Sequence, residues 1–135
     1  MNEIYLYIVM IIHFILVLFI IATPFTDSTF LLLMHGMIIP FIILHWLTNN
    51  NTCALTITEQ FIRYQLYGEI PESGCTFIGQ IIDPVYKFTE NNKENVAIIY
   101  TVTIILWIIT MTKLRKKYTS GDLNVYINNF KKLTK

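Results

Sequence analysis

The sequence lacks the residue patterns that commonly mark catalytic sites. It contains no Cys-x-x-Cys, Gly-x-Ser-x-Gly or His-Glu-x-x-His motif, and it has no glycine-rich phosphate-binding loop. These patterns supply a redox pair of thiols, an activated serine, a zinc site and a cradle for phosphate groups. Without them, the sequence favours a protein that is not an enzyme.

Charged residues are scarce as well. They make up 14% of the 135 residues, against about 25% in ordinary soluble domains. Hydrophobic residues reach 54%, and the mean hydropathy is +0.53. This balance is typical of a chain that lies in lipid.

Three stretches are long and apolar enough to cross a membrane, which takes roughly 20 helical residues. They run from Ile4 to Ala22, from Phe30 to Leu47 and from Val96 to Met111. The first begins beside Glu3 without any Lys or Arg, which favours a retained anchor over a cleaved signal peptide. The sequence therefore predicts an all-α integral membrane protein with three transmembrane helices.

Basic residues predict how these helices are oriented. Four of them directly follow the third span, whereas the N-terminus and the 24–29 loop have none; they are Lys113, Arg115, Lys116 and Lys117. Basic flanks resist translocation across the membrane. We therefore expect a transmembrane domain over 1–112 with its N-terminus outside, residues 49–94 outside, and a cytoplasmic C-terminus.

Residues 113–135 form a basic amphipathic tail in this interpretation. The four cations should bind anionic lipid headgroups, each with about 1 kcal/mol. Leu123, Tyr126, Ile127 and Phe130 recur at helical spacing after a possible cap at 120–122. The tail is thus expected to lie on the membrane surface or on a partner protein.

The connection between the second and third spans is predicted to hold one or two short amphipathic or re-entrant helices. Thr56 and Glu59 have the spacing of a capping box, and Gly68 is placed to end that helix. Arg63 follows Glu59 by four residues, which predicts an ion pair. A second helical stripe begins at Phe77.

The apolar face of the first short helix is expected to lie on the membrane or on the other helices. Its stripe consists of Ile57, Phe61 and Tyr64, widened by Ile62 and Leu66. The second stripe reaches Val85 and is interrupted at Pro84.

Three histidines, His13, His35 and His45, fall inside the predicted spans, where polar groups are costly and suggest function. One interpretation is a haem or metal site. Along their helices, however, no two of them lie at a similar depth. We therefore expect neutral histidines that are hydrogen-bonded between helices, with no metal or cofactor, and keep haem as the alternative.

Two cysteines, Cys53 and Cys75, lie in the connection assigned to the outside. In an oxidising compartment, a disulfide between them would stabilise the connection by about 3 kcal/mol. The alternative is a pair of free thiols.

A set of motifs in this region resembles a family of small uncharacterised polytopic membrane proteins, found in bacteria and, in similar form, in large DNA viruses. The motifs are His45-Trp46-Leu47-Thr48, Cys53-Ala54-Leu55-Thr56 with Glu59 and Arg63, Phe77-Ile78, and Pro84-Val85-Tyr86. Ala54 replaces the family's Pro, and Gln80 stands where a His is expected.

This resemblance covers about residues 7–112 and implies the three-span architecture, with Trp46, Thr56, Glu59 and Arg63 as motif residues, but no activity. The composition is biased, with 24 Ile and three Ala. Together with the resemblance, this bias suggests a viral source and hence a host or virion membrane.

Two functions remain open at this level. The first is a structural or interaction protein whose partners are the bilayer, a membrane protein or a second copy of the chain, with no nucleic acid. The alternative is a small redox or transport component that uses the intramembrane histidines and the cysteine pair.

Overall fold

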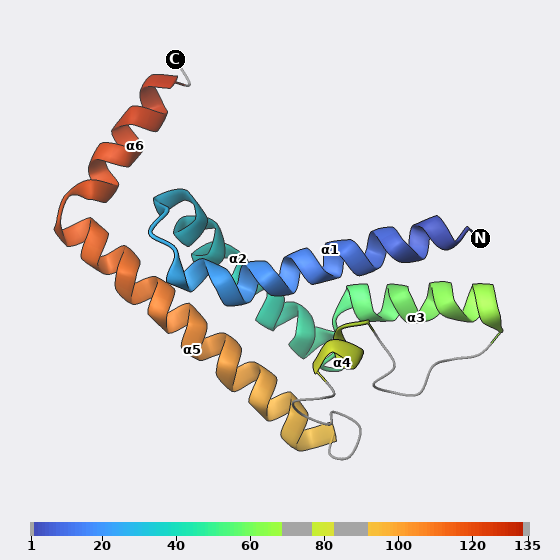
Figure 1. Cartoon of the computed structure of the whole chain (residues 1–135). Helices are drawn as coiled ribbons and strands as arrows, with labels where there is room; N and C mark the ends of the chain where they lie inside the picture. Colours follow the sequence, from blue (N-terminus) through green and yellow to red (C-terminus); the bar gives the residue numbers. More distant parts are fainter. Residues whose placement is uncertain (1, 69–76, 83–91, 134–135) are drawn as a thin grey trace.

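The structure is a computed structural model that describes residues 2–68, 77–82 and 92–133. Within these ranges its regular elements are all helices, as predicted (Figure 1). Its elements are α1 (Glu3–Ala22), the 3-10 turn η1 (Thr23–Phe25), α2 (Thr29–Thr48), α3 (Ala54–Tyr67), α4 (Phe77–Ile82), α5 (Asn92–Thr119) and α6 (Asp122–Leu133).

The described part contains three helical segments that are long and apolar enough to cross a membrane, which confirms the three predicted stretches. They are Glu3–Phe25, Thr29–Thr48 and Lys93–Thr119. The third is much longer than predicted. At about 1.5 Å per residue, the 28 residues of α5 span about 42 Å, so the helix is longer than the thickness of a hydrocarbon core, about 30 Å.

Helices α2 and α5 pack together, and the C-terminal half of α1 joins them (Figure 1). The buried face of α2 follows the helical repeat and consists of Leu32, His35, Gly36 and Ile39. Ile39 forms a small apolar core with Ile20 of α1 and Leu106 of α5.

At Gly36, side chains of α5 lie directly against the backbone of α2. A Cβ atom at this position would lie 2.8 Å from Met111 Cε and 3.3 Å from Leu114 Cδ1. The absence of a side chain therefore allows these helices to pack closely, as small residues do at interfaces between membrane helices.

The N-terminal half of α1 diverges from α2 and α5 and packs against α3 instead, which runs in the opposite direction (Figure 1). The face of α3 that contacts α1 contains the buried residues Glu59 and Ile62. The predicted stripe points elsewhere, because Ile57, Phe61 and Tyr64 are exposed. The other described helices leave this stripe uncovered, and its placement on the membrane stays a prediction.

The prediction of a capping box at Thr56 and Glu59 was wrong. Cys53, not Thr56, is the N-cap residue, and α3 begins at Ala54. The Glu59 carboxylate is directed toward Arg63 and the backbone of Phe77, so it does not return to the start of the helix. The predicted end is confirmed: Gly68 has φ 73°, a left-handed conformation that suits glycine.

The second short helix is confirmed as α4, which covers Phe77–Ile82. Pro84 and Val85 lie outside the described residues. The amphipathic tail helix is confirmed as α6, and the chain turns between α5 and α6 at residues 120–121.

Candidate functional site

Two prolines leave two backbone carbonyls without their usual helical partner. In an α-helix, each carbonyl accepts a hydrogen bond from the N–H four residues later. Proline has no N–H, so Pro24 cannot bond the Ile20 carbonyl and Pro40 cannot bond the Gly36 carbonyl. Both carbonyls therefore need a donor from elsewhere.

His35 satisfies the first of these carbonyls. Its Nε2 atom lies 3.1 Å from the Ile20 carbonyl oxygen, and its Nδ1 atom lies 3.0 Å from the Thr110 hydroxyl. A carbonyl only accepts, so Nε2 carries the proton and Nδ1 accepts from Thr110. The fully buried His35 thus connects α1, α2 and α5. This confirms the prediction of a histidine that is bonded between helices.

Trp107 satisfies the second carbonyl. Its indole Nε1–H donates to the Gly36 oxygen at 3.0 Å and so joins α5 to α2. Trp107 was not among the site residues predicted from the sequence. The signal was present, because a proline inside a helix indicates a free carbonyl four residues earlier.

His45 has a different role at the end of α2. Its Nε2 accepts the Ala54 N–H at 3.1 Å and therefore caps the start of α3. The neighbouring Trp46 packs edge-on against Tyr100 of α5, with ring centroids 5.6 Å apart. Tyr100 in turn donates its hydroxyl to Asn51 Oδ1 at 2.9 Å, which ties α5 to the turn after α2.

The predicted ion pair between Glu59 and Arg63 is confirmed. Glu59 is 0% exposed, and its Oε1 accepts Arg63 Nε at 3.0 Å, Arg63 Nη2 at 2.9 Å and the Phe77 N–H at 2.9 Å. Arg63 Nη2 also lies 3.8 Å from Met10 Sδ in α1. The pair therefore holds α1, α3 and α4 together.

His13 lies beside this ion pair rather than beside the other histidines. It is only 6% exposed, and its neighbours on α1 flank the pair: Met10 Sδ lies 3.8 Å from Arg63 Nη2, and the Phe14 ring packs edge-on against Phe77. The separation of 46 residues gave no sequence signal for this pairing.

The histidines do not converge on a metal centre. Over residues 2–68, 77–82 and 92–133, no three His, Cys, Asp or Glu side chains are grouped so that they could hold a metal ion. Both ring nitrogens of His35 already bond protein groups, so it offers no free ligand atom for haem.

The two cysteines are not both described. Cys53 is half-buried at the N-cap of α3, and Cys75 lies outside the described residues. The disulfide between them stays a prediction. Thr56 is half-buried in the first turn of α3.

The basic end of α5 is partly engaged by the protein itself. Lys113 Nζ donates to the Thr26 carbonyl at 3.1 Å and lies 3.4 Å from Asp27 Oδ1. Arg115 and Lys116 are exposed on the following turn, and Lys117 is half-buried. Lys113 therefore links α5 to the turn between α1 and α2.

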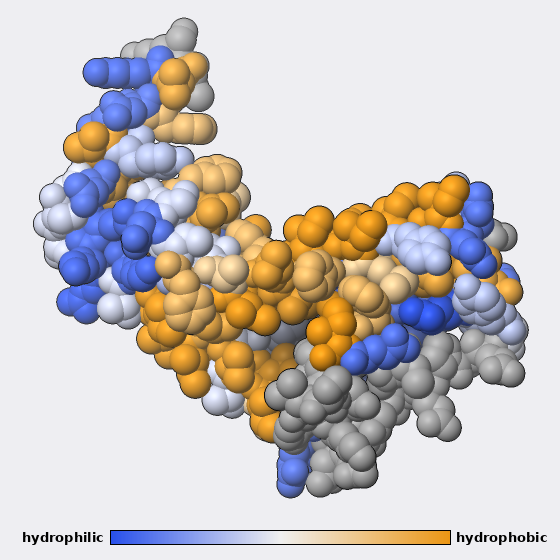
Figure 2. All heavy atoms as spheres, in the orientation of Figure 1, coloured by the Kyte–Doolittle hydropathy of each residue, from blue (hydrophilic) through white to orange (hydrophobic). Residues whose placement is uncertain are grey.

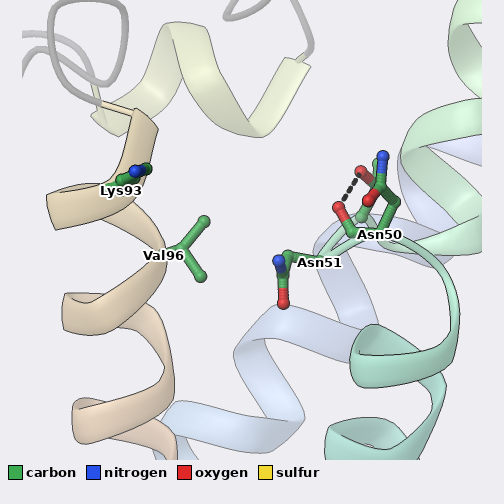
Figure 3. A pocket seen from close by; sticks show the side chains of 5 residues that line it. Asn50, Asn51, Lys93 and Val96 are labelled. Carbon is green, nitrogen blue, oxygen red and sulfur yellow. Dashed lines mark hydrogen bonds between the residues drawn. The ribbon is translucent and has the colours of Figure 1, made fainter.

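Two cavities flank the turn between α2 and α3. A polar pocket of about 450 Å³ is lined by Asn50, Asn51, Thr52, Lys93 and Val96. Figure 3 shows Val96 facing Asn51 across it, with Lys93 one turn earlier on α5. An apolar groove of about 490 Å³ lies between α1, α2 and the start of α3 and is lined by residues such as Leu16, Phe41, Trp46 and Leu55. The polar pocket offers amide, hydroxyl and ammonium groups, which suit hydrogen bonding rather than bond cleavage.

Comparison with protein-family models, with curated proteins and with solved structures finds no match to this chain. The resemblance to the small polytopic membrane proteins stays a prediction.

The His35 bridge predicts a clear loss of stability on substitution. His35→Leu leaves the Ile20 carbonyl and the Thr110 hydroxyl buried without this partner, so the free energy of unfolding should fall by about 1 to 3 kcal/mol. Reversible unfolding in mixed detergent micelles measures this change.

Two Thr→Val substitutions on α5 extend this test, one at the bridge and one as its matched control. Thr110→Val should cost part of the same free energy, because it removes the hydroxyl that donates a hydrogen bond to His35 Nδ1. Thr101→Val should cost little, because the exposed Thr101 bonds only the Ala97 carbonyl of its own helix among the contacts seen. A His35→Leu variant as stable as the wild type would contradict the bridge.

Proposed function

We propose that this chain is a multi-pass integral membrane protein with a structural or interaction role. The observation that carries the proposal is the outward-facing apolar surface of its long helices (Figure 2). Ile4, Ile11 and Ile15 of α1 are each 58% exposed, and Phe41 of α2 is 74% exposed. Soluble monomers rarely expose continuous apolar surface of this kind. Lipid would remove its cost of about 25 cal/mol per Å² in water.

The polar groups inside the bundle support a structural role. His35, Thr110 and Trp107 are used in contacts between helices. Glu59 and Arg63 are used in the same way between α3, α1 and α4. Groups that hold helices together do not need a substrate to explain their burial. The partners proposed are lipid, a membrane protein or a second copy of this chain.

The proposed orientation has the N-terminus outside and the C-terminus in the cytoplasm. The contacts of Lys113 with Thr26 and Asp27 support it, because they bring the turn between α1 and α2 to the same end of the bundle as the basic end of α5. The contact between Tyr100 and Asn51 marks the opposite end. Positive charge at one end favours the cytoplasmic side for that end.

Membrane insertion and orientation can be tested together. A single reporter cysteine placed after Lys135, in a chain with Cys53→Ser and Cys75→Ser, should be labelled only from the cytoplasmic side. The protein should also stay in the membrane pellet during alkaline extraction. Labelling of the reporter from outside would contradict the orientation, whereas release into the supernatant would contradict insertion.

The C-terminal helix α6 is proposed to bind the membrane surface. Figure 2 shows hydrophilic residues gathered around the end of α5 and along α6. The apolar stripe of α6 remains partly uncovered, since Ile127 is 39% exposed and Phe130 57% exposed. An isolated helix of 12 residues is marginal in water, so it needs a surface on which to bury this stripe. Arg115 and Lys116 would attract that surface if it contains anionic lipid.

A fluorescent probe on α6 tests this docking. In the full chain, with the native cysteines replaced by Ser, an environment-sensitive dye on Phe130→Cys should shift to the blue in vesicles that contain anionic lipid. The shift should be lost at high salt, because screening weakens the attraction of the cations. The same dye on Asn128→Cys, outside the stripe, is the matched control. No shift at position 130 would make a protein partner the better candidate.

A further inference from the structure

Two polar atoms beside the first long helix are buried without a hydrogen-bond partner in the part of the chain that the structure describes. They are His13 Nδ1 on α1 and Glu59 Oε2 on α3. Both residues are more than nine-tenths buried, with 6% and 0% of their surfaces exposed. Buried polar atoms in native proteins nearly always have a partner, either from the protein or from ordered water.

The two atoms are chemically complementary. Glu59 Oε2 belongs to a carboxylate that is paired with Arg63 and can only accept a hydrogen bond. A neutral imidazole carries one N–H, so His13 can present Nδ1 as a donor. Contacts on either side of His13 along α1 place the two groups in the same region. Arg63, which donates to Glu59, lies 3.8 Å from Met10 Sδ. Phe77, whose N–H donates to Glu59, has its ring centroid 6.3 Å from that of Phe14.

The described groups that bond Glu59 all donate to its other oxygen. Arg63 donates from Nε and Nη2 to Glu59 Oε1 and approaches Met10 Sδ, and the Phe77 N–H donates to the same oxygen, Oε1. These contacts leave the second oxygen of Glu59 as the acceptor that needs a donor. A small ligand that both donates and accepts would satisfy this oxygen and the imidazole together.

We propose that His13 and Glu59 form a buried site for one water molecule, which donates to Glu59 Oε2 and accepts from or donates to His13 Nδ1. This assignment rests on the fold and not on the proposed membrane role. It distinguishes the two deeply buried histidines by what their rings bond. His35 bonds only protein groups, whereas His13 is hydrated and open to exchange with water.

Water-to-nitrogen magnetisation transfer in solid-state NMR tests the site. The sample is the full-length chain with ¹⁵N-labelled histidine in lipid bilayers, carrying His45→Gln so that two ring signals remain. Transfer from water protons should reach the His13 ring several times faster than the His35 ring. Equal, slow transfer to both rings would overturn the proposal, as would a direct bond from His13 to Glu59 that excludes water.

A paired substitution provides the control. Glu59→Leu with Arg63→Leu removes the acceptor without leaving an unpaired charge, and apolar replacement of a buried ion pair is often tolerated. Transfer to His13 should then fall to the rate of His35, whose unchanged signal reports an intact bundle. Unchanged fast transfer to His13 in this variant would also overturn the proposal. If the His35 signal is lost, the comparison of the two rings in the parent chain still decides.

Discussion

The packing of this bundle depends on two backbone carbonyls that prolines set free. In an apolar surrounding there is no water to bond them, so a neighbouring helix has to supply a donor. His35 and Trp107 supply these donors to Ile20 and Gly36. The need for these bonds fixes which faces of α1, α2 and α5 meet, and the missing side chain of Gly36 lets α5 come close enough.

The remaining polar contacts extend this arrangement toward both ends of the bundle. The pairing of Tyr100 with Asn51 ties α5 to α2 at one end, and Lys113 ties α5 to the turn after α1 at the other. The diverging half of α1 is held differently, through the ion pair on α3. The molecule therefore combines a bundle whose centre is joined by neutral hydrogen bonds with a diverging half of α1 that is held by a buried ion pair.

Sequence patterns predicted the positions of the helices better than the contacts between them. Apolar runs located all three long helices, the spacing of Glu59 and Arg63 predicted their ion pair, and Gly68 marked a helix end. Hydrophobic spacing located the apolar stripe of Ile57 and Phe61 on α3, but it did not predict the inward face, which carries the buried Glu59 and Ile62. The placement of His13 beside the ion pair of Glu59 could not be predicted, since it depends on how α3 folds back along α1. The Trp107 bond was partly predictable, because Pro40 already indicated a free carbonyl at Gly36.

A double-mutant cycle on Pro40 and Trp107 tests the central claim most directly. Pro40 lies inside the continuous helix α2, so Pro40→Ala restores an N–H in the position that bonds Gly36. Trp107→Phe removes the indole donor but keeps most of the aromatic surface. With Pro40 in place, the loss of the indole bond should lower the free energy of unfolding by about 0.6 to 1.7 kcal/mol, as for other hydrogen bonds between membrane helices. With Ala at position 40, the same substitution should cost clearly less. An equal cost in both backgrounds would contradict the account.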